Sequence, residues 1–262
     1  SAYSRQGERK GLKSSGVPVV SGLKSKDLVG IPWQVALALR KDGWFLRLDV
    51  IWHKLNPMPE SVTDRPTKAH EYLFLLSKSG HYFYDMDAIK EESTGCESFG
   101  NHGLKVSLNN DRQDGSRSDP TPRNFRNKRS VWALSVEPYR GAHFATMPTA
   151  LVEPCILAGT SKKGCCPTCG SPWQRTIETE GWAPTCGCER KGDLTRGVVL
   201  DVFSGSGTTG AVANRLGRDY IGIDLNPDFL PLAKSRILGN EPPEITKNED
   251  SVDFSDFFGE EE

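Results

Sequence analysis

The sequence predicts an α/β fold of Rossmann-like type that carries a small cysteine-rich insertion. Residues 198–238 have the order strand, glycine turn, helix, strand, helix, which is typical of a parallel sheet with crossover helices. Five of the seven cysteines fall within residues 165–188. In a chain that does not begin with a secretion signal, such clustering favours a metal site over disulfides.

The first half of the chain predicts one helix and several strands. Asp27 is a suitable N-cap for a helix over residues 28–43, whose apolar side chains recur roughly on one face. Aromatic and β-branched residues predict a strand over 44–54. Residues 71–85 predict two strands that form a hairpin around the turn Lys78-Ser79-Gly80.

The second half supplies the remaining elements. Ordered structure resumes at 131–134, and we expect strands at 198–203 and 220–224 and helices at 147–159, 208–217 and 227–238. The main domain then comprises residues 1–90, 131–160 and 197–239, interrupted by a polar insertion at 91–130 and the cysteine-rich insertion at 161–196, and followed by an acidic tail at 240–262.

The composition is that of a soluble, cytoplasmic protein. Hydrophobic residues make up 36% of the 262 positions, and no apolar run approaches the length of a membrane span. Residues 1–140 carry 22 basic against 16 acidic residues, which suits a polyanionic partner, although ordinary solvated faces explain the imbalance equally well. Residues 240–262 carry one lysine and nine acids, which predicts a disordered tail.

A glycine-rich turn is the most informative segment. Residues 205–210 have the pattern G-x-G-x-x-G between an expected strand and an expected helix. Glycines allow a sharp turn and a close approach to a ligand, and the helix N-terminus offers unpaired N–H groups. Asp224 ends the next strand, 17 residues after Gly207, where an acid can accept hydrogen bonds from ribose hydroxyls. The pattern therefore predicts a nucleoside cofactor, with a purely structural turn as the alternative.

The negative charge next to the glycine turn helps to distinguish between the candidate cofactors. Asp201 directly precedes the turn. A carboxylate there would repel the pyrophosphate of a nicotinamide or flavin dinucleotide. It suits S-adenosylmethionine, whose amino and sulfonium groups are cationic.

Residues 201–210 (DVFSGSGTTG) and 217–227 (GRDYIGIDLNP) resemble the cofactor-binding end of the DNA N4-cytosine/N6-adenine methyltransferases. Residues 141–159 are similar to the family segment directly before this loop. Residues 26–78, with Asn-Pro-Met-Pro at 56–59 and Ala-His-Glu at 69–71, are similar to the segment after the family's catalytic loop. The resemblance covers roughly 26–90 and 130–238, and its order is that of the permuted subgroup with the glycine loop near the C-terminus.

The resemblance implies a Rossmann-like methyltransferase sheet, S-adenosylmethionine as cofactor and DNA as partner, in a restriction–modification context. It implies cofactor contacts from His143, Phe144, Pro148, Asp201, Phe203, Ser204, Gly205, Ser206, Gly207, Thr208, Thr209, Asp224, Leu225 and Asn226. The position and basic charge of the insertion 91–130 predict that it is the target-recognition region, with phosphate contacts from Arg112, Arg117, Arg123, Arg126, Lys128 and Arg129.

The family's catalytic (S/D/N)-P-P-(Y/F/W) loop has no counterpart here. Pro242-Pro243 is the one Pro-Pro pair, and no aromatic residue adjoins it in the acidic tail. We therefore name no catalytic residue and expect the chain to be a fragment without turnover, with a gap in the sheet beside the glycine-loop strand. His70 lies near the base pocket in the family, but a hydrogen-bonded histidine at a strand start is an equal interpretation. Trp33 and Trp52 are expected in the core.

The cysteine pattern predicts a structural zinc site. Cys166-Pro-Thr-Cys169-Gly has the form of a zinc knuckle, and Cys186-Gly-Cys188 supplies a second pair of thiolates. Free thiols and a disulfide are the alternatives, and Cys165 is an alternative ligand to Cys166. Cys155 is expected in the core.

Two other functions remain open from the sequence. One is a catalytically inactive zinc-ribbon module that binds nucleic acid and retains the cofactor fold. The other is an RNA or protein methyltransferase. The choice between N4-cytosine and N6-adenine and the oligomeric state are not determined by these residues.

Overall fold

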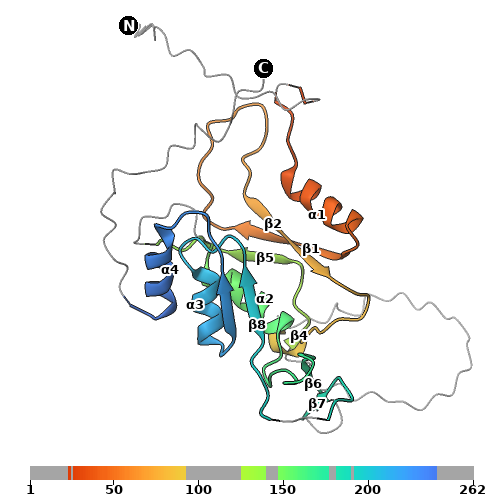
Figure 1. Cartoon of the computed structure of the whole chain (residues 1–262). Coiled ribbons are helices and arrows are strands. Elements are labelled where there is room, and N and C mark those ends of the chain that lie inside the picture. The colour runs from red at the N-terminus through yellow and green to blue at the C-terminus, as the bar shows by residue number, and fades with distance from the viewer. Residues whose placement is uncertain are drawn as a thin grey trace, which may run out of the picture.

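The computed structural model describes residues 23–24, 26–92, 125–139, 147–176, 181–189 and 192–240. Its helices are α1 (Ile31–Lys41), the 3-10 turn η1 (Asp87–Ile89), α2 (Thr149–Gly159), α3 (Thr208–Arg215) and α4 (Phe229–Ile237). Its strands are β1 (Phe45–Lys54), β2 (His70–Ser77), β3 (Glu91–Glu92), β4 (Phe125–Arg126), β5 (Val131–Leu134), β6 (Trp173–Arg175), β7 (Trp182–Pro184), β8 (Val198–Asp201) and β9 (Asp219–Gly222). The fold is mixed α/β (Figure 1).

Two separate sheets carry the main domain. In the first, β1 lies between β2, which is antiparallel to it, and β5, which is parallel. In the second, β8 and β9 are parallel and are joined through α3, as the β-α-β pattern predicts. Parallel pairing follows because the eight-residue helix returns the chain to the same end of the sheet.

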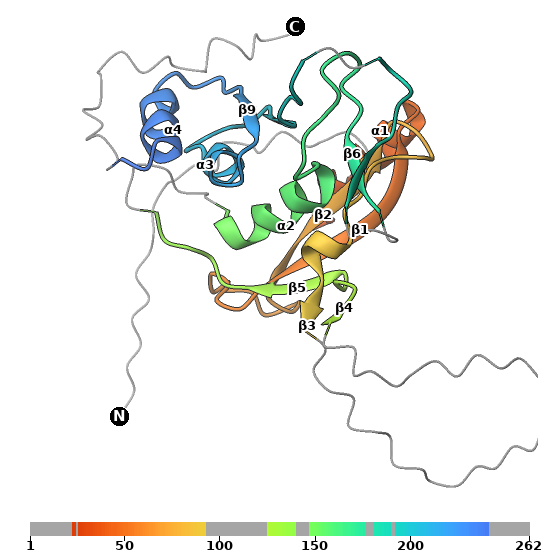
Figure 2. The same cartoon turned by 90° about the horizontal axis from the view of Figure 1, so that it is seen from below.

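Helix α2 lies between the β2-β1-β5 sheet and the unit formed by β8, α3 and β9. Figure 2 shows it between the β2-β1-β5 sheet and α3. Its buried Val152 and Ile156 pack with Val212 and Ala213 of α3. These four side chains form the core under the glycine turn, and they fix where α3 begins relative to α2.

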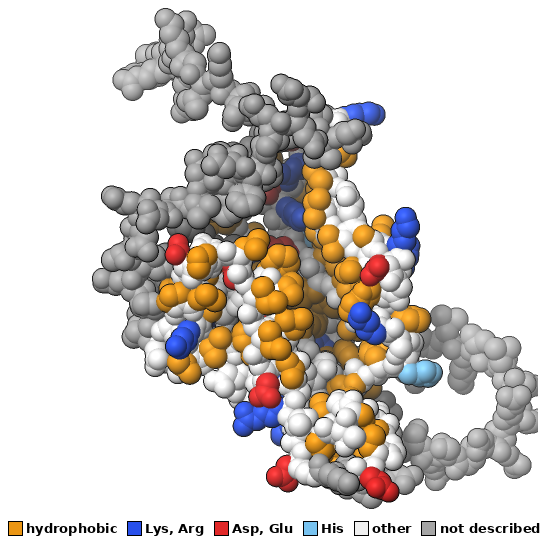
Figure 3. Space-filling model, in the orientation of Figure 1, with side chains coloured by type: hydrophobic (Ala, Val, Ile, Leu, Met, Phe, Trp, Pro, Cys, Tyr) orange, Lys and Arg blue, Asp and Glu red, His pale blue; other side chains and the backbone are white. Residues whose placement is uncertain are grey.

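Strands β2 and β8 do not pair with each other, and a gap separates the two sheets. Two adjoining cavities of about 370 and 770 Å³ occupy it, and Leu73 of β2 and Val198 of β8 line both. Hydrophobic side chains flank the hollow (Figure 3). Within the described residues β8 has β9 as its one partner strand, so the predicted gap beside the glycine-loop strand is confirmed.

Several local predictions were wrong. Helix α1 begins after Gly30, whose left-handed conformation (φ 71°) ends the preceding segment, and Asp27 instead accepts a hydrogen bond from the Lys24 backbone N–H. Residues 81–85 form no strand, so 71–85 is not a hairpin, and β2 pairs instead with β1. Cys155 is exposed and lines the gap, not the core.

The ends of the polar insertion are held together. β3 and β4 pair antiparallel, and the Glu91 carboxylate accepts hydrogen bonds from the guanidinium groups of both Arg126 and Arg129, at 2.8 Å each. The insertion residues Arg112, Arg117 and Arg123, and the tail with Pro242-Pro243, lie outside the described residues. None of the described helices is long and apolar enough to cross a membrane.

Candidate cofactor and metal sites

The glycine turn is closed by its own backbone. Gly205 and Gly207 have φ angles of 50° and 77°, a region in which side chains are strained. The Gly207 N–H donates to the Ser204 carbonyl at 2.9 Å, and the Ser204 N–H donates to the carbonyl of Ile223, beyond β9, at 2.8 Å. The turn is therefore fixed to both strands of the second sheet.

Close packing against α4 explains why position 207 is glycine. A Cβ atom there would lie 2.8 Å from Cα and 2.9 Å from Cβ of Ala233. At Gly210, a Cβ atom would lie 2.6 Å from the side chains of Tyr220 and Ile237. The predicted residues from Gly205 to Thr209 are all buried, and Ser204 is half-buried.

Asp224 lies beside the glycine turn, two residues beyond the end of β9 and not within the strand as predicted. One of its carboxylate oxygens accepts the Gly205 N–H at 2.7 Å, and the other accepts the Asn226 N–H at 2.9 Å. Each oxygen retains a further lone pair, so the side chain can still accept a hydroxyl proton. It joins the glycine turn to the segment after β9 and places Asn226 beside it.

Asp201 lies at the end of β8, and only one of its two carboxylate oxygens accepts a hydrogen bond within the described residues. Its Oδ1 accepts the Phe203 N–H at 3.0 Å. Its Oδ2 is buried and has no hydrogen-bond partner within the described residues. Because an unpaired buried acceptor costs free energy, this oxygen marks the place where a cationic donor would be stabilised.

The other predicted contacts are distributed around this turn. Phe203 and Leu225 are 81% and 90% exposed, so two large apolar side chains near the turn are mostly open to solvent. Pro148 is fully buried at the N-cap of α2, where no further surface remains for a ligand to cover. His143 and Phe144 lie outside the described residues.

Two residues that the sequence did not single out complete the turn. The hydroxyl oxygens of Tyr220 and Ser204 lie 2.9 Å apart. Arg236 of α4 donates from one Nη1 to Ser206 Oγ at 2.9 Å and Thr208 Oγ1 at 2.7 Å. Tyr220 lies within the 217–227 motif, but the motif does not reveal its contact with Ser204, and Arg236 lies outside every motif, because both contacts arise from tertiary packing.

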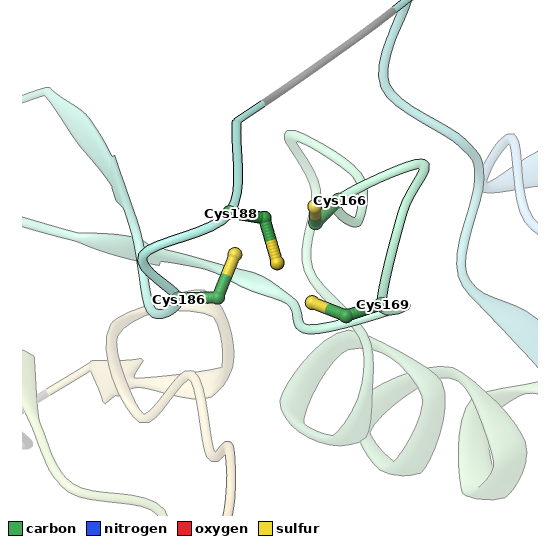
Figure 4. Close-up of side chains that lie close together, drawn as sticks. All are labelled: Cys166, Cys169, Cys186 and Cys188. Carbon is green, nitrogen blue, oxygen red and sulfur yellow. The ribbon is translucent and has the colours of Figure 1, made fainter.

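The four predicted metal ligands come together. The sulfur atoms of Cys166, Cys169, Cys186 and Cys188 all lie within 4.8 Å of one another. Figure 4 shows the four thiols directed towards one centre. A tetrahedral zinc–thiolate site has sulfur atoms about 3.8 Å apart, for zinc–sulfur bonds of about 2.3 Å, so the donor set fits zinc after small adjustments.

The electrostatics of this cluster favour a cation. The backbone N–H groups of Cys169 and Thr168 lower the pKa of Cys166. Hydrogen bonding with Ser171 lowers the pKa of Cys169 to about 6. Hydrogen bonds with Cys169 and Cys186 raise the pKa of Cys188 to about 12. The thiols therefore do not all ionise together without a positive charge between them.

Cys165 is not part of the cluster. Its backbone N–H and carbonyl pair with Thr195, at 2.8 and 3.0 Å, which ties the cysteine-rich insertion to the segment that enters β8. A second attachment is the ion pair between Arg175 of β6 and the buried Asp85, at 2.9 Å. These contacts fix the insertion to the segment that leads into β8 and to Asp85, which lies just before η1.

The aromatic residues have structural partners. Trp52 is buried and its indole N–H donates to the Leu134 carbonyl at 3.0 Å, which confirms it as a core residue. Trp33 is 39% exposed and meets the rings of Tyr72 and Phe74 edge-on, so its assignment to the core was wrong. His70 Nε2 lies 3.1 Å from Tyr72 Oη.

Comparisons with known proteins find similar methyltransferases. The chain is 41% identical over 220 residues to the type II methyltransferase M.Cfr9I of Citrobacter freundii, covering 84% of this chain and 53% of that protein. It is 41% identical over 221 residues to the type II methyltransferase M.SmaI of Serratia marcescens, covering 84% and 56%. The chain thus spans about half the length of these curated relatives.

Among solved structures, the PvuII DNA methyltransferase (cytosine-N4-specific) is 16% identical with a TM-score of 0.48, covering 83% of this chain and 60% of that one. The complex of M1.HpyAVI with SAM is 19% identical with a TM-score of 0.45, covering 80% and 71%. The family model described as DNA methylase matches residues 7–235. Since this match spans most of the sequence, the chain belongs to the N6_N4_Mtase family of DNA methylases.

Proposed function

We propose that the protein transfers a methyl group from S-adenosylmethionine to the exocyclic amine of cytosine (N4) or adenine (N6) in DNA. In this proposal the chain supplies the cofactor-binding part of a Rossmann-like methyltransferase. The supporting observation is the Asp201 carboxylate, whose buried Oδ2 lacks a partner in the described structure at the mouth of the glycine turn. A cationic ligand is the group that such an oxygen stabilises best.

The residues around the turn have distinct roles in this proposal. Asp201 would hold the cofactor's ammonium group, and Asp224 would accept its ribose hydroxyls. Phe203 and Leu225, both highly exposed, would cover the adenine ring. The cofactor, when bound, supplies an electrophilic methyl group, and the protein holds it in line with the amine.

The gap between β2 and β8 has a place in the same proposal. A strand that pairs with the free edge of β8 would continue the parallel sheet and would bury Val198, which is 56% exposed. Such a strand would deliver a catalytic loop to the carboxyl end of β8, beside Asp201. We propose that the family's catalytic segment occupies this position.

The cysteine cluster is proposed to hold one structural zinc ion. Four sulfur ligands from Cys166, Cys169, Cys186 and Cys188 leave no open coordination position, so the ion would fasten the insertion and would not act in catalysis. This cluster also favours the second candidate function, an inactive zinc-ribbon module that binds nucleic acid. Methyl incorporation into DNA by the full-length protein distinguishes the two.

The partner is proposed to be DNA, as part of a restriction–modification system, and the place of action the cytoplasm. Names of the relatives support the first two points, since both are type II methyltransferases. The basic insertion remains the proposed target-recognition region. Because Glu91 neutralises Arg126 and Arg129 at its base, phosphate contacts would come first from its other basic residues.

Calorimetric titration with S-adenosylmethionine tests the cofactor assignment. Asp201→Asn preserves the side-chain volume and the acceptor for Phe203 but removes the charge. We expect its affinity to fall about 10- to 100-fold, as for a lost hydrogen bond to a charged group. Asp219→Asn is the matched control, since that exposed carboxylate lies at the opposite end of β9 and should leave the affinity unchanged.

Three outcomes separate the possibilities. Weaker binding by Asp201→Asn with unchanged binding by Asp219→Asn supports the assignment. Equal binding by wild type and Asp201→Asn would refute the role of Asp201. A folded full-length protein that neither binds the cofactor nor labels DNA would refute the proposed function.

A further inference from the structure

Arg236 occupies an unusual position for a charged residue. It lies in the last turn of α4, on the helix whose Ala233 packs directly against Gly207. Its guanidinium donates to the hydroxyls of both Ser206 and Thr208. These two residues flank Gly207, so one side chain holds the glycine turn on both sides of its left-handed residue.

The same guanidinium contacts the segment before α2. Its central carbon lies 4.7 Å from the centroid of the Tyr139 ring, a cation–π contact. Two residues earlier, the Glu137 carboxylate accepts the backbone N–H of Thr149 at 3.0 Å and its hydroxyl at 3.1 Å. Glu137 thereby supplies the side-chain acceptor that the N-cap residue of α2, Pro148, lacks.

Burial makes these contacts strong. Desolvation lowers the pKa of Arg236, and the nearby Tyr139 and Glu137 oppose that shift. Ser206 and Thr208 are 3% and 4% exposed, so water cannot replace the guanidinium as the hydrogen-bond partner of their hydroxyls. A guanidinium remains charged under these conditions, and its hydrogen bonds are charge-assisted.

We propose that Arg236 is a positioning residue for the cofactor, which links the glycine turn to the Glu137–Tyr139 segment and keeps both in register for binding. The inference rests on the proposed function, because the glycine turn is taken to be the cofactor site. Arg236 does not need to touch the cofactor. It acts by fixing Ser206 and Thr208, so that the backbone N–H groups of the turn keep one orientation.

The neighbouring helix provides a matched control. Arg215 ends α3 and donates to Glu153 of α2 at 3.0 Å, but both side chains are substantially exposed, at 53% and 40%. It resembles Arg236 in type and in its place at a helix end, and differs in not contacting the turn. Arg215→Met should therefore leave cofactor affinity within about two-fold of wild type.

The experiment compares Arg236→Met, Arg236→Lys and Arg215→Met. Calorimetry gives the affinity for S-adenosylmethionine, thermal unfolding gives the Tm, and initial rates of DNA methylation by the full-length protein separate KM from kcat. For Arg236→Met we expect affinity about 10- to 100-fold weaker and KM raised to match, with kcat nearly unchanged. Arg236→Lys retains the charge and should recover part of the loss.

The outcomes are separable from those of the proposed function. If wild type binds the cofactor and Arg236→Met loses affinity while Arg236→Lys recovers part, the inference is supported. If the folded Arg236→Met protein has a lower Tm but wild-type affinity and KM, Arg236 is merely structural and the inference is overturned. If Arg236→Met does not fold, Ser206→Ala combined with Thr208→Val removes the same contacts and must produce the same rise in KM. Failure of wild type itself to bind would overturn both proposals.

Discussion

The glycine turn and the cysteine cluster are both short turns that gather ligand atoms, but they are stabilised differently. The glycine turn is supported by packing: Gly207 lies against Ala233, and Val212 and Ala213 are buried beneath it. In the cysteine cluster Cys166 is buried, Cys186 and Cys188 are half-buried, and Cys169 is exposed. Hydrogen bonds with Cys169 and Cys186 raise the pKa of the Cys188 thiol, whereas the pKa of Cys169 is lowered.

The difference shows which site can exist before its ligand arrives. Backbone hydrogen bonds close the glycine turn without any ligand, and one buried oxygen of Asp201 has no partner within the described residues. The cysteine cluster needs a cation to let all four sulfurs be thiolates at once. We therefore expect a preformed cofactor pocket and a metal-dependent insertion.

The largest effect should come from Cys166→Ser. Loss of one of four thiolates should abolish tight zinc binding, for which structural sites contribute roughly 10 kcal/mol or more. Atomic absorption after dialysis against a chelator measures the bound metal, and cobalt substitution reports thiolate ligation by its charge-transfer absorption. Cys165→Ser is the matched control, because its thiol lies outside the cluster. Loss of metal from Cys165→Ser as well would contradict the assigned ligand set.

A smaller but global effect is expected from Gly207→Ala. The added Cβ would meet Ala233 at 2.8–2.9 Å in a backbone conformation with φ 77°. Strain and overpacking together should lower the free energy of unfolding by about 2–5 kcal/mol. Gly217→Ala has a similar φ of 70° but open space around it, so about 1–2 kcal/mol is expected. Urea unfolding measures both, and equal losses would show that packing against α4 does not matter.

The smallest effect should come from Arg175→Met, which removes the ion pair with Asp85, one of the two attachments of the cysteine-rich insertion. Asp85 is 3% exposed, but Arg175 is 39% exposed and Asp85 keeps its hydrogen bond from the Ala88 N–H. We expect a loss of about 1 kcal/mol in unfolding free energy. Arg196→Met, which breaks an exposed pair with Asp219 at 3.8 Å, should cost almost nothing. A zinc content that falls with Arg175→Met would mean that the attachment also shapes the cluster.

Patterns of neighbouring residues were enough to predict several features. The order strand, glycine turn, helix, strand places Asp201 and Asp224 at one turn, because the carboxyl ends of adjacent parallel strands meet at the same edge. The spacing Cys-Pro-Thr-Cys predicts two thiols on one turn. Within the described residues β8 pairs with β9 alone, which agrees with the unpaired edge expected from the family resemblance.

Other features were decided only by the tertiary structure. Local preference favoured Asp27 as a helix cap and a hairpin around Lys78-Ser79-Gly80, but α1 begins after Gly30 and β2 pairs with β1. Arg236 carries no motif, since its partners lie 28 and 30 residues away in sequence. Sequence by itself determined the ligand-bearing turns, whose geometry depends on a few adjacent residues. The contacts that hold those turns in place come from helix packing and strand pairing. Both depend on segments that are far apart in the sequence and bury their surfaces against each other.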